Sequence, residues 1–181
     1  MVTKIETKPG KNLSKTEVDL INKHRCIEFG LNEIINIQKD EAESTIFFVK
    51  REDKIVAFGM LKPITVEYLG KKYDILGFRS GIAIEKGKGY GKMVMQAMIK
   101  KCQEKDMTGL GFCLRRNAGF FDKCGLQIEK SFIKRFLYRN PVTKKIKKDT
   151  IGDGLYCNGK DDFIKKVLST KSPVYTDIPL W

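Results

Sequence analysis

A seven-residue stretch, "KGKGYGK" from Lys86 to Lys92, holds three glycines and three lysines. Glycine lets a backbone come close to a ligand, and the unpaired N–H groups at the start of a helix attract anions. The lysine side chains add positive charge at the same place. The stretch therefore predicts a cradle for phosphate oxygens, while a solvated turn rich in glycine and lysine is the alternative that fits the same residues.

The spacing of these residues excludes two common phosphate-binding motifs. No Ser or Thr follows a Gly-Lys pair, as a Walker A loop requires, and Gly87, Gly89 and Gly91 do not form GxGxxG. The flanking elements still suit a cradle, because the apolar run "IAI" before it predicts a strand and the residues after it predict a helix reaching about Lys105. The stripe that predicts this helix consists of Val94, Ala97, Met98, Lys101 and Cys102.

The rest of the chain alternates between helical and strand patterns. Ser14 and Glu17 have the spacing of a capping box, which predicts a helix over residues 15–28. One face of this helix is expected to hold Leu20, Ile21, His24 and Ile27. The segments "STIFFVK", "IVAFGMLKPITVEY" and "YDILGFRSGIAI" predict an antiparallel meander of strands.

Beyond the helix that ends near Lys105, the order of patterns continues as strand, helix, strand. It comprises the strand "GLGFCL", a short helix beginning near Asn117, the long strand "LQIEKSFIKRFLYR", a strand near "DGLYC" and the helix "DDFIKKVLS". This order predicts an α/β (α+β) fold, in which helices cover both faces of a mixed, mostly antiparallel twisted sheet of about six or seven strands.

Length and composition predict one domain, residues 1–181, whose last part, 158–181, is a C-terminal helix and tail of unassigned role. The start of the chain is polar and lysine-rich, unlike a signal peptide, and no window approaches the ~20 apolar residues of a membrane helix. We therefore expect a cytoplasmic protein, as a monomer or homodimer, without membrane contact. The five cysteines lack the spacing of metal sites, so no bound metal is expected.

The formal net charge of +13 favours anionic partners. Residues 130–148 contain no acidic residue, which predicts either a surface for nucleic acid or another polyanion, or a solvated hairpin face. The eight basic residues of this segment are Lys130, Lys134, Arg135, Arg139, Lys144, Lys145, Lys147 and Lys148.

The stretch "KGKGYG" resembles the pyrophosphate loop of the GNAT superfamily of acyl-CoA-dependent N-acyltransferases, with Lys86, Gly89 and Gly91 on the positions of its pattern. Further along the chain, "NAGFFDKCGL" resembles the second signature of that family. Two matches in the family's order and spacing are more specific than either alone. The resemblance covers roughly Ser14 to Cys157 and implies a GNAT-like domain with splayed strands at an acyl-CoA site.

The resemblance implies acetyl-CoA, or another acyl-CoA, as cofactor, and an amine as the second substrate. Backbone N–H groups of the glycine stretch would hold the pyrophosphate, the end of the preceding strand would pair with the pantetheine arm, and Asn117 would either touch that arm or cap its own helix. The residues implied to bind the cofactor are Ile82, Ala83, Ile84, Lys86, Gly87, Lys88, Gly89, Tyr90, Gly91, Lys92, Asn117 and Phe121.

The implied reaction is direct attack of a primary amine on the thioester in a ternary complex, with the backbone of Ala83 as an oxyanion donor. This sequence departs from the family's pattern at two places, and the catalytic acid and base are therefore unassigned. Phe121 stands where the family usually has a tyrosine, and residues 78–84 hold no carboxylate. Tyr138 and Glu85 are weak candidates, as are a water chain and the C-terminal carboxylate of Trp181. A GNAT-like domain that binds acyl-CoA without turnover therefore stays an alternative, as does a nucleic-acid-binding module.

Four further side chains have two interpretations each. Arg79 and Ser80 precede the expected reaction centre, where they could bind an anionic or hydroxylated substrate, but a salt-bridged arginine at a sheet end fits equally. Cys113 lies on the strand beside the expected thioester site, so it is either an acyl-accepting nucleophile or a buried structural thiol. His24, the only histidine, is expected to be a packing or surface residue before a catalytic one.

Overall fold

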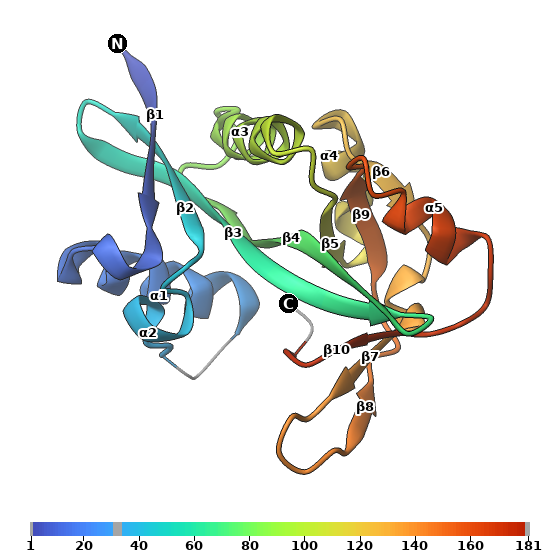
Figure 1. The fold of residues 1–181 in the computed structure, drawn as a ribbon. Coiled ribbons are helices and arrows are strands. Elements are labelled where there is room, and N and C mark those ends of the chain that lie inside the picture. Colours follow the sequence, from blue (N-terminus) through green and yellow to red (C-terminus); the bar gives the residue numbers. More distant parts are fainter. Residues whose placement is uncertain (1, 31–33, 180–181) are drawn as a thin grey trace. The chain divides into compact units, whose positions relative to one another are not determined.

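The structure is a computed structural model that describes residues 2–30 and 34–179. Its described residues divide into two compact units, each considered by itself below. The first unit comprises Met1–Lys62 and Arg79–Met98, and the second comprises Pro63–Phe78 and Ile99–Trp181. Strands β3 (Lys54–Tyr68) and β4 (Lys71–Ala83) and helix α3 (Tyr90–Glu104) contribute residues to both units (Figure 1). The prediction of a single domain stays a prediction.

The first unit contains an antiparallel set of strands and the capped helix that the sequence predicts. Strand β2 (Thr45–Arg51) pairs with β3 on one side and with β1 (Thr3–Pro9) on the other. Helix α1 (Lys15–Phe29) begins with the predicted capping box, in which the Glu17 N–H donates to Ser14 Oγ and the Ser14 N–H donates to Glu17 Oε2. The short elements η1 (Gly10–Asn12) and α2 (Ile37–Asp40) complete this unit.

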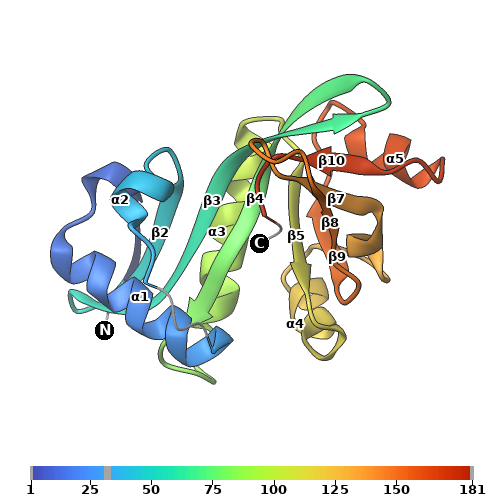
Figure 2. The same ribbon diagram turned by 90° about the horizontal axis from the view of Figure 1, so that it is seen from below.

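Helices lie on both faces of the strands in the first unit, as predicted. Because strand side chains alternate between faces, Phe58 and Met60 point toward α1 and α2, and a side chain at Gly59 would point the other way, into Val94 and Met98 of α3. Figures 1 and 2 show α1 and α3 on opposite sides of β3. The core on the α1 side consists of Leu13, Ile21, Ile37, Ile46, Phe48, Phe58, Met60 and Ile82.

The buried face of α1 differs from the predicted one. Ile27 was expected to be on this face, but its side chain is 62% exposed. The face instead follows an i, i+4, i+8 row that begins with Glu17, whose carboxylate receives a hydrogen bond from Lys8 Nζ at 2.7 Å, and ends with Arg25. A buried charge with a partner packs as well as an apolar residue, so polarity alone misplaced the face. The buried residues of α1 are Glu17, Ile21, Asn22 and Arg25.

The second unit contains strands in the order β6-β9-β5-β4-β3-β10-β7-β8. The pairs β4–β5 and β10–β7 are parallel, and the other pairs of this unit with assigned registers are antiparallel. The bounds of its elements are β5 Gly109–Cys113, η2 Arg115–Asn117, α4 Ala118–Lys123, β6 Gln127–Glu129, η3 Phe132–Arg135, β7 Phe136–Arg139, β8 Ile146–Lys148, β9 Asp153–Cys157, α5 Phe163–Leu168 and β10 Val174–Thr176.

A single long strand over "LQIEKSFIKRFLYR" was predicted, and that prediction is wrong. The backbone turns at Ser131, whose φ is 55°, so β6 and β7 pair with different neighbours. The Ser131 N–H donates to Asp153 Oδ1 at 2.8 Å, and the turn buries Phe132 and Ile133. Burial of these two side chains and the side-chain hydrogen bond stabilise the turn over a continuous strand.

The fold class is confirmed, since a mixed, mostly antiparallel sheet carries helices. The described residues form ten strands, more than the six or seven predicted. One split strand and three strands that were not predicted account for the difference. The predicted long strand is divided into β6 and β7. Of the other three, β1 carries mostly exposed polar side chains, β8 is three exposed residues, and β10 lies within the predicted tail. Strand β10 is fixed by pairing with both β3 and β7, which local sequence does not reveal.

Candidate functional site

The glycine stretch lies where the sequence predicts, between the end of β4 and the start of α3, all within the first unit. Gly87 has a φ of 74° and Gly89 a φ of 82°, a backbone conformation that side chains other than glycine's adopt only with strain. A Cβ at either position would have no atom within 4 Å among the described residues. Backbone conformation, not crowding, thus calls for glycine here, and it leaves open space over the turn.

The start of α3 presents unpaired donors beside this open space. The Met93 N–H donates to the Gly89 carbonyl oxygen at 3.1 Å, so the N–H groups of Tyr90, Gly91 and Lys92 precede the first helical hydrogen bond. The positive end of the helix dipole adds to them. Lys88 and Lys92 are exposed at the same end. Together these groups form a cradle that suits the oxygens of a phosphate or pyrophosphate.

Three ion pairs among five charged side chains hold the turn before the cradle. Glu85 forms ion pairs with Arg51 at 3.3 Å and with Lys54 at 3.4 Å. Arg51 also donates a hydrogen bond to the hydroxyl of the buried Tyr90, and this bond and the Glu85 charge raise the pKa of Arg51. Lys86 Nζ pairs with Glu28 Oε1 of α1 at 2.7 Å. Glu85 therefore already neutralises two cations, which disfavours it as a general base.

The end of β4 carries an irregularity beside the cradle. Ser80 has a φ of 49°, the signature of a bulge, and this explains how Arg79 and Ile82 both face the α1 and α2 side despite their odd spacing. The N–H groups of Ile84 and Glu85 both donate to the Val56 carbonyl oxygen. The assigned register between β4 and β5 pairs Leu76 with Gly109 and Gly77 with Leu110, and β4 itself continues to Ala83.

The remaining predicted site residues belong to the second unit. Asn117 is exposed at the start of α4, and its side chain makes no capping hydrogen bond there, which leaves the capping interpretation without support. Phe121 is half-buried and packs edge to face with Phe120 at a centroid distance of 5.1 Å. Tyr138 is half-buried on β7, between Thr176 of β10 and Lys147 of β8.

The basic segment 130–148 divides into internal and exposed cations. Arg135 donates to the carbonyl oxygens of Val167 and Ser172. Arg139 forms ion pairs with Glu67 and Asp177. Both arginines therefore stabilise the second unit through internal contacts. The lysines of the segment are all exposed to solvent. These residues are Lys130, Lys134, Lys144, Lys145, Lys147 and Lys148.

Cys113 and His24 lie in surroundings that favour their uncharged forms. Burial, with a smaller effect of the Asp153 charge, raises the pKa of the Cys113 thiol to about 11. Little thiolate is then present near neutral pH, so the structure favours a structural thiol over a nucleophile. Burial, followed by the charge of Lys23, lowers the pKa of His24 on α1.

A group of charged residues that the sequence did not single out as a set lies in the first unit. The Glu41 carboxylate, 3% exposed, pairs with Arg79, with Lys62 at 3.2 Å and with the Ser44 hydroxyl at 2.7 Å. Arg25 of α1 is 7% exposed and interacts electrostatically with both Glu41 and Arg79. Of the four charged members, only Arg79 was recognised from sequence. The signal for Arg25 was its spacing, one helical turn after Ile21 on the buried row.

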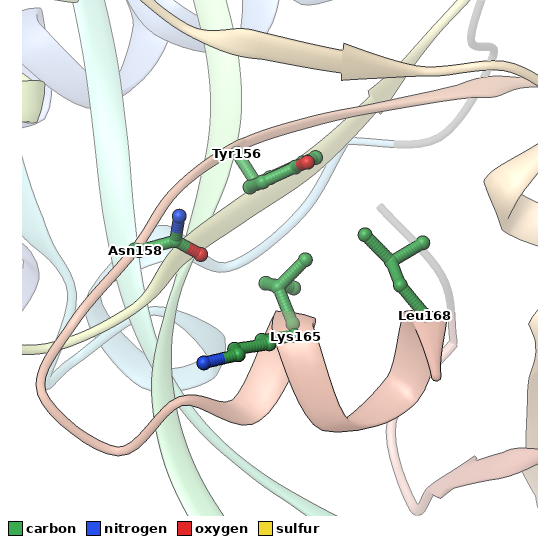
Figure 3. A pocket seen from close by; sticks show the side chains of 5 residues that line it. Tyr156, Asn158, Lys165 and Leu168 are labelled. Atoms are coloured by element: carbon green, nitrogen blue, oxygen red, sulfur yellow. The ribbon is translucent and has the colours of Figure 1, made fainter. Parts of the chain in front are cut away.

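A surface hollow in the second unit is lined by residues of β9 and α5 (Figure 3). Its volume of about 240 Å³ is below the roughly 300–1,000 Å³ of most ligand pockets. It is lined by Tyr156, Asn158, Ile164, Lys165 and Leu168, and none of these was predicted as a site residue. The hollow is therefore not part of the candidate site.

The described residues contain neither a metal-binding cluster nor a helix suited to crossing a membrane. In residues 2–30 and 34–179, no cluster of three or more His, Cys, Asp or Glu side chains is arranged to hold a metal ion. No helix in the same part of the chain combines the length and the apolar character needed to cross a bilayer. Trp181, considered above as a source of a carboxylate, lies outside the described residues.

Comparison with known proteins gives one family and many similar structures. The model of the acetyltransferase (GNAT) family matches residues 19–126, more than half of the chain. A search of curated proteins found no match. Among solved structures, Escherichia coli ElaA is similar with a TM-score of 0.57 and 15% identity, over 86% of this chain and 99% of that one.

Two similar crystal structures were determined with acetyl coenzyme A. One is the N-acetyltransferase PseH of Campylobacter jejuni, with a TM-score of 0.53 and 16% identity over 86% of this chain and 99% of that one. The other is a predicted acetyltransferase of Clostridium acetobutylicum, with a TM-score of 0.51 and 14% identity over 70% of this chain and 90% of that one. At such identities the likeness concerns the fold.

Proposed function

Because the chain belongs to the acetyltransferase (GNAT) family, we propose that it transfers an acetyl group, or another acyl group, from its CoA thioester to a primary amine. The observation that carries the proposal is the cradle at the start of α3, where Gly87 and Gly89 adopt positive φ beneath open space. Such a turn suits the pyrophosphate of CoA. PseH and the Clostridium protein, whose folds are similar, were both crystallised with acetyl-CoA.

In this proposal the first unit supplies most of the cofactor contacts. Backbone N–H groups of residues 87–92 bind the pyrophosphate, and Lys88 and Lys92 add charge. The backbone of Ile82, Ala83 and Ile84, at the end of β4, pairs with the pantetheine arm. Lys86 keeps its Glu28 partner and so contributes to the shape of the turn. That Asn117 and Phe121 bind the cofactor stays a prediction.

The proposed chemistry is direct attack of the free amine on the thioester carbonyl. The Ala83 N–H stabilises the developing oxyanion, and proximity within the ternary complex supplies ~7 kcal/mol or more of the barrier reduction. A positioned base typically contributes ~10²–10⁴ in rate, and here Glu85 is the weak candidate for the base and Tyr138 for the acid that protonates the leaving thiolate. Since Glu85 already pairs with Arg51 and Lys54, solvent is the better acceptor for the amine proton. Binding without turnover is the alternative that Phe121 favours.

Release of CoA thiol tests this function directly. We expect the protein, incubated with acetyl-CoA and a panel of small amines, amino sugars, polyamines and lysine peptides, to release thiol faster with at least one amine than without any. Calorimetric titration of the same preparation with acetyl-CoA and with CoA measures the dissociation constant of each compound. Binding tighter than millimolar without amine-dependent thiol release would support the binding-only alternative, and no binding of either compound would contradict both.

A second candidate function, contact with a polyanion, rests on the exposed lysines of the β7–β8 hairpin. Four exposed lysines lie close together in the sequence of this hairpin: Lys144, Lys145, Lys147 and Lys148. They form a positively charged surface that could bind the phosphates of a nucleic acid. We expect their joint replacement by Gln to weaken RNA or DNA binding at least about tenfold at low salt, and to flatten its salt dependence. Fluorescence anisotropy at several salt concentrations measures both. Equal affinity of the variant and the original protein would rule this surface out.

A further inference from the structure

Arg25 is a buried cation that the described residues leave without hydrogen-bond partners at two of its nitrogens. Its side chain is 7% exposed, and its Nε and Nη1 atoms have no partner among residues 2–30 and 34–179. Burying a charged group without partners is costly, because its interactions with water are lost and not replaced. A protein retains such a group where something else supplies the missing acceptors.

The only carboxylate identified in this group is already occupied. One oxygen of Glu41 accepts from Arg79, and the other accepts from the Ser44 hydroxyl at 2.7 Å and lies 3.2 Å from Lys62 Nζ. Lys62 further donates to the Asp40 carbonyl oxygen at 2.9 Å. Arg25, Lys62 and Arg79 therefore share one carboxylate, and positive charge is in excess. Burial and the nearby Arg79 charge both lower the pKa of Arg25, whereas Glu41 raises it.

The cluster reaches the surface and lies near the proposed reaction centre. Lys62 and Arg79 have side chains that are 20% and 22% exposed, so the cluster extends from the buried Arg25 to two residues that contact solvent. Arg79 is four residues before Ala83 on β4, on the order of 13 Å along a strand, and both belong to the first unit. A small molecule spans such a distance.

We infer that Arg25, Lys62 and Arg79 bind an anionic group, a carboxylate or a phosphate, of the amine that accepts the acyl group. This inference rests on the proposed function. Arginine and lysine donate charge-assisted hydrogen bonds to both kinds of anion, and Arg25 has donors without partners at Nε and Nη1 that can each supply a single bond. The acceptor class is accordingly a small amine with a negatively charged group several bonds from its nitrogen, in preference to a neutral amine or a polyamine.

Thermal melting of the full chain tests the site without requiring turnover. Acetate and inorganic phosphate serve as the probes, each exchanged for chloride at constant ionic strength in the presence of saturating CoA. We expect at least one probe to raise the melting temperature by about 2 °C or more, because a ligand that binds only the folded state stabilises it. A response to phosphate alone indicates a phosphorylated acceptor, and a response to acetate alone indicates a carboxylated one.

Variants of Arg25 separate binding from a structural role. Arg25→Met removes the charge while keeping the length, so without anion we expect its melting temperature to stay the same or to rise by roughly 2–4 °C, with the probe response abolished. Arg25→Lys keeps a charge and should retain part of the response. Lys23→Gln, which removes an exposed cation from the same helix, is the matched control and should respond like the original protein.

The outcomes distinguish this inference from the proposed function. The proposed anion site is contradicted, even where acetyl-CoA binds, by either of two results. One is that neither acetate nor phosphate raises the melting temperature of the original protein. The other is that both probes raise the melting temperatures of Arg25→Met and the original protein equally. A large loss of stability in both Arg25→Met and Arg25→Lys would mean a structural role and would also overturn it. If calorimetry shows no acetyl-CoA binding while the probes stabilise the original protein but not Arg25→Met, the anion site stands and the proposed acyl transfer fails.

Discussion

Replacement of Gly89 by Val is expected to weaken acetyl-CoA binding by roughly 5- to 150-fold. The φ of 82° at this position costs a β-branched residue about 1–3 kcal/mol, and the loop can escape that cost only by leaving the conformation that exposes its N–H groups. The open space around the position means that no clash contributes. Calorimetric titration with acetyl-CoA measures the change in dissociation constant.

Gly89→Asn is the control for this prediction. Asparagine tolerates positive φ better than other residues with a side chain, so it should retain more affinity than valine although it is of similar size. Neither variant should lose core contacts, because the position is exposed and touches no core residue, so any fall in melting temperature should come from backbone strain and be smaller for Gly89→Asn. Equal affinity of Gly89→Val and the original protein would show that the turn does not hold the cofactor.

Replacement of Gly10 by Ala is expected to lower the free energy of unfolding by about 3 kcal/mol, which corresponds to a melting temperature lower by roughly 6–12 °C. A Cβ at this buried glycine would overlap the carbonyl group of Glu41 and lie 2.8 Å from its carbon. The obstacle is backbone, held by the Gly10 N–H donating to the Ser44 carbonyl oxygen at 2.9 Å, so it cannot rotate away. Thermal or denaturant unfolding measures the loss.

The same change at Gly119 is the matched control. Gly119 lies in α4 with nothing within 4 Å of an added Cβ, so Gly119→Ala should leave stability unchanged or raise it slightly. Because Glu41 also holds Lys62 and Arg79, Gly10→Ala should in addition reduce the stabilisation by acetate or phosphate. A melting temperature of Gly10→Ala within about 2 °C of the original would contradict the tight approach of the two segments.

Much of the fold could be predicted because several local signals agreed. The capping box at Ser14 and Glu17 predicted where α1 starts, and strand patterning predicted β2, β3 and β4 to within two residues. Elements with weak patterns were missed. The turn at Ser131 depends on Asp153, which is distant in sequence, and β10 depends on pairing with two other strands. Such long-range partners leave no periodic trace in the segment itself.

The residues of the candidate site likewise fall into those that the sequence predicted and those that only the structure revealed. The glycine stretch and the second signature were found from sequence, since each is a contiguous motif whose residue types follow from its local chemistry. Arg25, Glu41 and Lys62 were not found as a group, because they come from a helix, a loop and a strand that are separated along the chain. In the sequence, Glu41 and Lys62 are indistinguishable from ordinary surface residues, and Arg25 carries only the signal of its spacing from Ile21.

The sequence by itself determined that this chain has a mixed α/β fold with a glycine turn at a helix start, and it pointed to the GNAT family. These features are local, since glycine's freedom at positive φ and the hydrogen-bonding deficit of a helix start depend only on neighbouring residues. Only the tertiary structure decided that Glu85 is held by two cations and that Arg25 is buried without partners at two nitrogens. Burial and pairing of a charge are set by what folds against it, and that information is spread over the whole chain.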